Sequence, residues 1–319
     1  MKKVLITRKF PEQFVAPLRD VAEVVQWHEE HCAMPREELL QQVADVDAIW
    51  ATLEDKIDEE LLAHAPKLQM VANLAVGYNN LHIEALRERG IIATNTPNVL
   101  TNATADLAFG LLIATARRLV EGADYLREGK WQGWSPMQLT GMEVSGATLG
   151  IIGMGRIGSA VARRARGFDM QVLYHNRHRK YEDEEMYGFR YRELDALLQE
   201  SDFVMVLTPY TQETHHLINT RELQLMKETA IFINVSRGGV VNEEALYDAL
   251  KNQDIWAAGL DVFEQEPVSI THPLLTLPNV VALPHIASAS VKARYEMFKT
   301  NVEALLTFLD DDKPKNRLT

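Results

Sequence analysis

The chain has 319 residues, 46% of them hydrophobic and 24% charged, a composition typical of a globular protein with more than one core. Its formal net charge of −12 opposes non-specific binding to nucleic acid or anionic membranes. Because it has one cysteine, Cys32, and no Cys or His cluster at metal-ligand spacing, we expect a metal-free, cytoplasmic protein without a disulfide, signal peptide or membrane span.

Short apolar runs alternate with helix-like stretches in the first third of the chain. The runs are residues 3–7, 46–51, 70–74 and 91–94, with helical patterns such as 36–43 and 82–89 between them. Residues 100–127 then read as one long helix. A second series of runs follows at residues 148–152, 171–174, 203–207, 230–235, 256–262 and 280–283. Residues 288–309 are again helical, before the polar tail 310–319. This alternation predicts βαβ units around parallel sheets.

A glycine-rich motif begins the second series. It reads Gly153-Met-Gly155-Arg156-Ile157-Gly158, and it follows a strand-like run and precedes a helical stretch and another strand. That context is what a dinucleotide fingerprint requires. The first glycine permits a tight turn, the second lets the backbone approach a pyrophosphate, and the third lets helix and strand pack closely. We therefore predict a cofactor site here; the alternative is a structural glycine turn.

A basic loop follows the second strand of this unit. A site specific for NAD would place Asp or Glu there, about 20 residues after the glycines, to bind the ribose 2′-hydroxyl. This chain has the sequence His-Asn-Arg-His-Arg-Lys at 175–180. We expect Asn176, Arg177 and Arg179 to contact the cofactor, with the arginines, or Lys180, binding a 2′-phosphate. NADP(H) is thus the preferred cofactor, with NAD(H) possible; the alternative is a solvated basic loop.

Three polar residues each follow an apolar run. Arg237, Glu266 and His285 come after the runs that end near 235, 263 and 283. In open parallel sheets, ligands bind outside the carboxyl ends of the strands. Reduction of a keto acid needs a cation for the carboxylate and carbonyl oxygen, a proton donor, and a partner that keeps the donor protonated. Arginine, histidine and glutamate meet these needs, so we predict that the three residues are catalytic.

At these residues the chain resembles the D-isomer-specific 2-hydroxyacid dehydrogenase family over essentially its whole length. The matching motifs are residues 153–158, 234–241, 259–267 and 284–288. The resemblance implies that Arg237 binds substrate and that His285 is the acid/base, paired with Glu266. It also implies an α/β fold of two Rossmann-like domains with parallel sheets. The discontinuous substrate domain would span residues 1–98 and 287–319, and the inserted dinucleotide-binding domain residues 99–286.

The resemblance assigns further site residues. Val76 and Gly77 match a loop whose backbone amides hold the substrate carboxylate, and Ser288 is expected in the same site. The positions expected to line the cofactor site, mainly its nicotinamide half, are Thr208, Pro209, Val235, Asp261 and Ala287. Leu207 departs from the pattern, because many family members carry a histidine there.

Within the family, the chain is most similar to the glyoxylate/hydroxypyruvate reductases. The similarity lies in residues 131–136, Gly141, residues 284–289 and the basic loop. In that branch a tryptophan near this position enters the active site of the partner subunit, which implies such a role for Trp131 or Trp134. The alternative is an ordinary core or interface tryptophan. Family members commonly form homodimers through their cofactor domains, so we expect a homodimer.

We therefore expect a reductase that uses NADP(H) to convert a small 2-keto acid, such as glyoxylate or hydroxypyruvate, to its D-2-hydroxy acid. A 2-ketogluconate reductase remains an alternative, because all three substrates carry the same carboxylate and carbonyl. Relatives that act as nucleotide-sensing corepressors are another alternative, but the complete set of Arg237, Glu266 and His285 favours turnover. Formate dehydrogenases resemble the family with glutamine in place of the acidic partner, so Glu266 argues against that activity.

Overall fold

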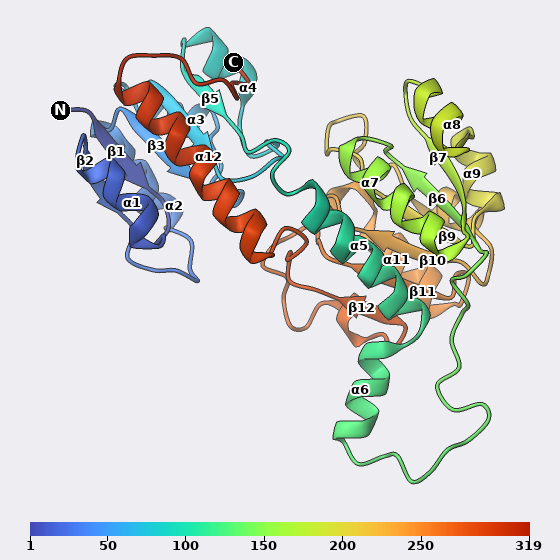
Figure 1. The fold of residues 1–319 in the computed structure, drawn as a ribbon. Coiled ribbons are helices and arrows are strands. Elements are labelled where there is room, and N and C mark those ends of the chain that lie inside the picture. The colour runs from blue at the N-terminus through green and yellow to red at the C-terminus, as the bar shows by residue number, and fades with distance from the viewer. The chain divides into compact units, whose positions relative to one another are not determined.

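The computed structural model describes all 319 residues of the chain (Figure 1). It divides into two compact units. The outer unit consists of Met1–Leu100 and Ser290–Thr319, and the central unit is Thr101–Ala289. The sequence predicts the domain boundaries between residues 98 and 99 and between residues 286 and 287. No helix combines the length and the apolar character needed to cross a membrane.

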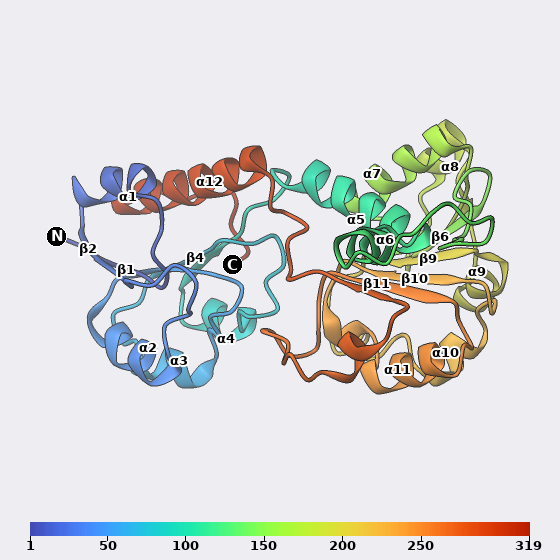
Figure 2. The ribbon, with the colours of Figure 1, turned by 90° about the horizontal axis from the view of Figure 1, so that it is seen from below.

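The outer unit is built on a five-stranded parallel sheet in the order β2-β1-β3-β4-β5. Its strands are β1 (Lys3–Ile6), β2 (Glu23–Gln26), β3 (Ala48–Ala51), β4 (Met70–Asn73) and β5 (Ile92–Thr94). In Figure 2, helices α1 (Glu12–Arg19) and α12 (Val291–Leu309) cover one face, and α2 (Arg36–Gln42), α3 (Glu59–His64) and α4 (Ile83–Glu88) cover the other. Because both faces are covered, β3 and β4 are buried at every position rather than at alternate ones.

The C-terminal tail completes the edge of this sheet. The amide of Leu318 donates to the carbonyl of Ala93 at 2.8 Å, and Thr94 forms an antiparallel bridge with Arg317. The tail therefore pairs with β5, whose outer edge would otherwise present unpaired backbone groups.

The central unit has a seven-stranded parallel sheet in the order β12-β11-β10-β9-β6-β7-β8. Its strands are β6 (Thr148–Ile152), β7 (Gln171–His175), β8 (Arg190–Tyr191), β9 (Phe203–Val206), β10 (Ile231–Asn234), β11 (Ala257–Leu260) and β12 (Val280–Ala282). The helices that accompany it are α5 (Thr101–Ala116), α6 (Leu119–Arg127), α7 (Arg156–Ala165), α8 (Tyr181–Tyr187), α9 (Leu194–Glu200), α10 (Thr220–Gln224) and α11 (Glu243–Lys251). Strand order reverses at β6, which pairs with both β7 and β9. Such a switch point is where doubly wound sheets bind ligands.

The prediction of one continuous helix over residues 100–127 is wrong. The structure has two helices, α5 and α6, with Arg118 between them in the left-handed conformation at φ +52°. The break has a tertiary cause: the amide of Met142 donates to the carbonyl of Ala116 at 2.9 Å. A Cβ atom on Gly141 would lie 2.2 Å from that same oxygen. The segment that contains Gly141 and Met142 therefore binds a carbonyl at the C-terminal end of α5, where the helix stops.

Candidate active site

The glycine-rich loop joins β6 to α7. Gly153 has φ +104°, and a Cβ atom there would lie 2.7 Å from the carbonyl carbon of Leu207. A Cβ atom on Gly158 would lie 2.4 Å from the oxygen of Gly153. Packing therefore requires both glycines. Gly155 is different, because a Cβ atom there would meet nothing within 4 Å. Its bare backbone instead leaves open space in front of the helix.

The surroundings of this loop fit a dinucleotide. Gly155 is the N-cap of α7 and supplies no capping side chain, so the first amides of the helix, including those of Arg156 and Ile157, are suited to an anion. The side chain of Asn176 holds the loop: its Oδ1 accepts from the amide of Met154 at 2.7 Å and its Nδ2 donates to that residue's carbonyl at 3.3 Å. The hydroxyl of Thr208 is buried without a partner, which leaves it available to a ligand.

The basic loop after β7 places its two arginines in different environments. Arg179 is ion-paired with Glu184, with its Nη2 atom 2.6 Å from Oε2, and its guanidinium lies over the ring of Tyr181 at 4.9 Å. The carboxylate of Glu184 is also hydrogen-bonded to Tyr174, and burial together with this bond raises the pKa of Tyr174 to about 12. Arg177 is 80% exposed, and its one ion pair, with Glu213, is 3.6 Å long. The geometry therefore leaves Arg177 more available to a phosphate than Arg179.

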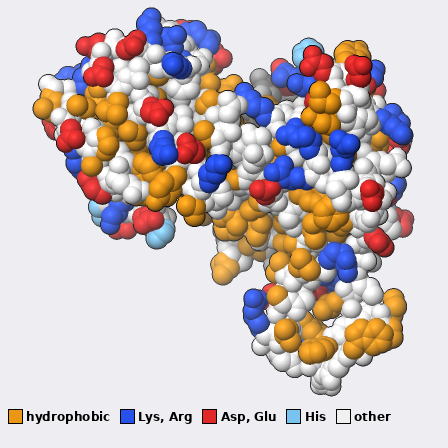
Figure 3. All heavy atoms as spheres, viewed as in Figure 1, with side chains coloured by type: hydrophobic (Ala, Val, Ile, Leu, Met, Phe, Trp, Pro, Cys, Tyr) orange, Lys and Arg blue, Asp and Glu red, His pale blue; other side chains and the backbone are white.

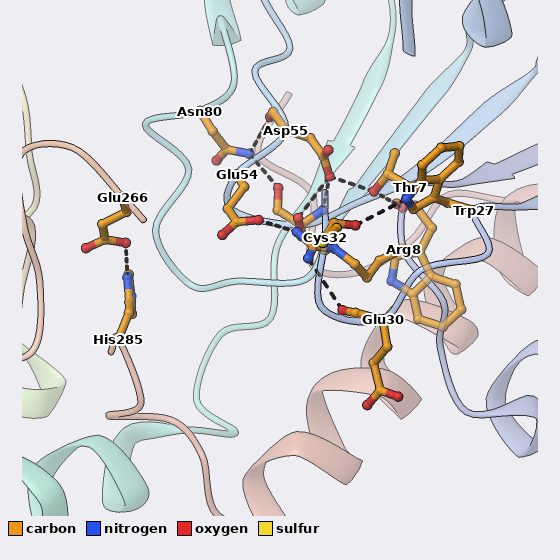
Figure 4. A network of polar contacts seen from close by, with 12 residues as sticks. Thr7, Arg8, Trp27, Glu30, Cys32, Glu54, Asp55, Asn80, Glu266 and His285 are labelled. Atoms are coloured by element: carbon orange, nitrogen blue, oxygen red, sulfur yellow. Dashed lines mark hydrogen bonds and ion pairs between the residues drawn. The ribbon is translucent and has the colours of Figure 1, made fainter. Parts of the chain in front are cut away.

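Glu266 and His285 form a close pair at the carboxyl ends of β11 and β12. Nδ1 of His285 lies 2.6 Å from Oε2 of Glu266, as Figure 4 shows. The amide of Phe263 donates to Oε1 of Glu266 at 2.9 Å. Burial raises the pKa of the Glu266 carboxyl, but the hydrogen bond and charge of His285 outweigh burial and the pKa is lowered. With the carboxylate on Nδ1, the Nε2 atom of His285 is the one that can exchange a proton with a ligand.

His285 is held in an uncommon backbone conformation. Its φ is +53°, a left-handed value that non-glycine residues seldom adopt. Asp261 supports it from the end of β11: its two carboxylate oxygens accept from the amides of Ile286 and Ala287, each at 2.8 Å. Burial raises the pKa of Asp261, while these amides act in the opposite direction. Asp261, which sequence analysis placed in the cofactor site, thus also fixes the loop that carries the histidine.

Arg237 follows β10 and begins the turn before α11. The carbonyl of Arg237 accepts from Nδ2 of Asn234 at 3.0 Å, and Nη1 of its guanidinium donates to the carbonyl of Ser236 at 2.7 Å. Burial lowers the pKa of the guanidinium, and the charge of Glu266 opposes that effect. The cation and the carboxylate are therefore close enough to influence each other. The structure thus brings Arg237, Glu266 and His285 together at one edge of the central sheet.

The remaining predicted site residues differ in how far their side chains are exposed. Val235 is 6% exposed and Ala287 8%, while Ser288 is partly buried and Pro209 exposed. Trp131 and Trp134 lie after α6 and are 56% and 82% exposed, so neither is a core tryptophan of this chain. In Figure 3, hydrophobic side chains gather where α6 and the segment after it lie.

Val76 and Gly77 lie in the outer unit, on the loop after β4, and both are partly buried. Asparagine side chains brace this loop, and sequence analysis did not single them out. They are Asn73, Asn80 and Asn95. Figure 4 shows Asn80 reaching the loop that contains Asp55. The available signal was the presence of asparagine at the ends of two adjacent apolar runs, where a buried amide needs several partners.

Comparison with known proteins places this geometry in a family. The profile described as "D-isomer specific 2-hydroxyacid dehydrogenase, NAD binding domain" matches residues 109–287. A glyoxylate reductase from Thermococcus onnurineus is 49% identical over 316 residues, which cover 98% of this chain and 94% of the relative. A glyoxylate reductase from Pyrococcus furiosus is 48% identical over the same shares of the two chains.

Solved structures of other proteins also resemble this chain over nearly its whole length. A protein from Thermus thermophilus, 44% identical, superposes with a TM-score of 0.92 and covers 99% of this chain and 100% of its own. An NADPH-dependent glyoxylate/hydroxypyruvate reductase from Sinorhizobium meliloti, in complex with NADP and malonate, is 34% identical with a TM-score of 0.87, covering 100% of this chain and 97% of that one. These matches confirm the predicted α/β fold of two parallel-sheet domains. The chain belongs to the D-isomer specific 2-hydroxyacid dehydrogenase family of nicotinamide-dependent oxidoreductases.

Proposed function

We propose that the protein is an NADP(H)-preferring reductase that converts small 2-keto acids, glyoxylate or hydroxypyruvate, to D-2-hydroxy acids. The observation that carries the proposal is the 2.6 Å contact between His285 and Glu266, with Arg237 just beyond the carboxyl end of the neighbouring strand β10. Relatives at 49% and 48% identity bear the name glyoxylate reductase, which supports this choice of substrate.

Each of the three residues has a defined role in the proposed reaction. Arg237 binds the carboxylate of the keto acid and stabilises the negative charge that develops on the carbonyl oxygen. The Nε2 atom of protonated His285 gives its proton to that oxygen. Glu266 keeps the imidazole oriented and favours its charged form. A bound reduced nicotinamide supplies the hydride. In the outer unit, the backbone amides of Val76 and Gly77 hold the substrate carboxylate.

The preference for NADP(H) is proposed from the loop after β7. No acidic residue lies at 175–180, so nothing there would repel a 2′-phosphate, and Asn176 is committed to the glycine-rich loop. Arg177 is exposed and weakly paired, which leaves its planar guanidinium suited to a bidentate phosphate contact. The Sinorhizobium meliloti relative, whose structure contains NADP, supports the same preference.

We also propose a homodimer formed through the central unit. Exposed apolar side chains are concentrated in α6 and the segment after it, and an apolar patch of that kind usually marks an interface. They include Leu119, Val120, Leu126, Trp131, Trp134 and Met137. Beside α6 there is also a hollow of about 700 Å³, lined in part by Val120 and Trp256. Sedimentation equilibrium tests this proposal, and a monomer at micromolar concentration would refute it.

The function is tested by measuring kcat/KM for glyoxylate, hydroxypyruvate and 2-ketogluconate with NADPH and with NADH. We expect turnover of the first two with NADPH, and a loss of about 10²- to 10⁴-fold in His285→Ala. His64→Ala, on the exposed surface of α3, is the matched control and should keep wild-type rates. NADPH binding without oxidation by any keto acid would instead favour a nucleotide-sensing protein.

A further inference from the structure

The loop that follows β4 carries three consecutive peptide groups whose carbonyls are all held by hydrogen bonds. The carbonyl of Ala75 accepts from the amide of Thr96 at 3.0 Å. The carbonyl of Val76 accepts from Nδ2 of Asn95 at 2.8 Å. The carbonyl of Gly77 accepts from Nδ2 of Asn73 at 3.0 Å. The backbone of this loop is therefore fixed peptide by peptide, by groups from the ends of β4 and β5.

Holding a carbonyl also sets the direction of an amide. In a planar trans peptide the C=O and N–H bonds point to opposite sides, so each of these three hydrogen bonds aims the following N–H away from the residue that holds the carbonyl. The amides concerned belong to Val76, Gly77 and Tyr78. No acceptor of the chain takes a hydrogen bond from any of them. Backbone donors on consecutive residues that have no acceptor in the chain suit a carboxylate, which is stabilised by two or three such bonds.

The two asparagines are themselves fixed. Asn73 is fully buried and forms a reciprocal amide pair with Asn80, at 3.4 and 3.2 Å. Asn80 in turn donates to the carbonyl of Asp55 at 3.0 Å, a contact drawn in Figure 4. Asn95 is 8% exposed, and its carbonyl accepts from Nδ2 of Asn316 in the C-terminal tail at 2.5 Å. Each amide is therefore pre-positioned before any ligand arrives.

We propose that Asn73 and Asn95 are positioning residues that set the carboxylate-binding geometry of the Val76–Gly77 loop. The inference rests on the proposed function, in which that loop binds the substrate carboxylate. A neutral amide suits this task because it can donate to a carbonyl without adding a charge that would compete for the anion. Neither residue touches the substrate; each acts through a backbone carbonyl.

This role predicts a specific kinetic signature. The substrate carboxylate keeps its charge throughout reduction, so its contacts contribute equally to ground-state and transition-state binding. Weakening such contacts raises KM and leaves kcat nearly unchanged. One hydrogen bond is worth about 0.5 to 1.5 kcal/mol, so in Asn95→Ala and Asn73→Ala we expect KM for glyoxylate to rise up to about tenfold. The dissociation constant of malonate, a carboxylate probe that does not turn over, should rise by the same factor.

The experiment measures malonate binding by calorimetry with NADPH bound, KM and kcat for glyoxylate, the NADPH dissociation constant, and thermal stability. Thr94→Val is the matched control: its hydroxyl is buried without a partner, so its loss should leave all four unchanged. Asn316→Ala, in the partly exposed tail, is a milder variant that removes the support of Asn95. It should raise the same two constants by a smaller factor and is not expected to unfold the protein.

Unchanged malonate affinity in the folded Asn95 or Asn73 variants, or an equal loss in Thr94→Val, would overturn the inference. A fall in kcat with constant KM would also contradict it. The malonate measurement needs no turnover, so it is independent of the proposed activity. If wild-type protein reduces no keto acid yet binds malonate in a manner that depends on Asn95, the proposed reaction fails and the positioning role stands.

Discussion

Glu266 holds His285 on one side and its own loop on the other. Oε2 lies 2.6 Å from Nδ1 of the imidazole, and Oε1 accepts from the amide of Phe263. Although burial raises the pKa of Glu266, the hydrogen bond and charge of His285 lower it below its usual value. The ionised carboxylate is thus held against Nδ1 of the imidazole, where it orients the ring.

In Glu266→Gln the shape of the pair remains and the negative charge is lost. We expect kcat/KM for keto-acid reduction to fall, because an uncharged amide orients the imidazole and balances its charge less well than a carboxylate does. The measurement is kcat/KM of wild type and mutant with saturating NADPH.

Glu264→Gln is the matched control for this prediction. Glu264 lies two residues away and also contacts a histidine, with Oε1 2.9 Å from Nε2 of His216. Its loss should leave kcat/KM unchanged. If Glu266→Gln lowers only thermal stability and not kcat/KM, the carboxylate is a loop cap and the proposed relay is wrong.

Arg237 is expected to be needed for chemistry rather than for cofactor binding. Arg237→Ala should lower kcat/KM for the keto acid by about 10²- to 10³-fold or more, because a positioned cation is lost from the developing oxyanion. NADPH affinity should change by only a small factor. Arg237→Lys keeps the charge but not the planar fork, so we expect partial activity. Near-normal kcat/KM in Arg237→Ala, measured by NADPH oxidation, would remove this residue from the mechanism.

The two arginines of the basic loop should contribute unequally to cofactor choice. Arg177→Ala should weaken NADPH binding about tenfold or more, since a charged hydrogen bond to phosphate is worth about 1.5 to 3 kcal/mol, while NADH binding is nearly unaffected. Arg179→Ala should have the smaller effect, because Arg179 is already ion-paired with Glu184. Fluorescence titration with both cofactors tests this prediction. Equal losses of affinity for NADPH and NADH would argue against phosphate recognition.

How far sequence predicts this structure depends on whether the cause of a feature is local. Gly153 and Gly158 could be assigned because a tight turn and a close helix–strand contact demand glycine wherever they occur. The buried strands β3 and β10 were clear because both faces are covered. The edge strands β2 and β8 were missed: β2 is partly exposed along its length and β8 has two residues, too little for a pattern to register.

Features with a tertiary cause were beyond the sequence pattern. Nothing in residues 116–119 signals a helix break, since the break depends on Gly141 returning to the carbonyl of Ala116. The left-handed φ of His285 likewise accompanies a contact that is distant in sequence, because Asp261 accepts from the two amides that follow the histidine. The pairing of Glu266 with His285 came from family resemblance; its distance and its effect on the pKa of Glu266 needed coordinates.

Gly238 lies where two loops of the site pack against each other, and this position should not tolerate a side chain. A Cβ atom there would lie 1.8 Å from the carbonyl carbon of Phe263 and 2.1 Å from the amide nitrogen of Glu264. Gly238→Ala must therefore push the Arg237 turn away from the loop that carries Glu266. We expect a cost of about 1 to 3 kcal/mol in stability and a fall in kcat.

Gly110→Ala is the control for that substitution. Gly110 lies in α5, where an added Cβ would meet nothing within 4 Å, and alanine is the better helix former by about 1 kcal/mol. This variant should be at least as stable as wild type and fully active. Wild-type stability and kcat in Gly238→Ala, measured by thermal unfolding and NADPH oxidation, would show that the two loops are not packed as described.

Asp58 should make the outer unit sensitive to acid. It caps α3, with Oδ1 accepting from the amide of Leu61 at 3.0 Å, and it is ion-paired with Arg36 and Lys56. Burial raises the pKa of its carboxyl, but the Leu61 amide and the two cations outweigh burial and lower it to about 2. A carboxyl with a lowered pKa stabilises the folded state above its unfolded pKa, and that contribution is lost as pH falls through the folded value.

Two substitutions separate the cap of Asp58 from its charge. Asn caps helices about as well as Asp, so Asp58→Asn should lower the free energy of unfolding at neutral pH through lost charge alone. The difference from wild type should shrink below about pH 4 and become small toward pH 2, where wild-type Asp58 itself takes up a proton. Asp58→Ala also loses the cap, about 0.5 to 2 kcal/mol, at every pH. Urea unfolding followed from about pH 7 to about pH 3 tests this. A gap between wild type and Asp58→Asn that stays constant over that range would mean that the ion pairs contribute nothing, because Asp58 is the only titrating group in which the two proteins differ.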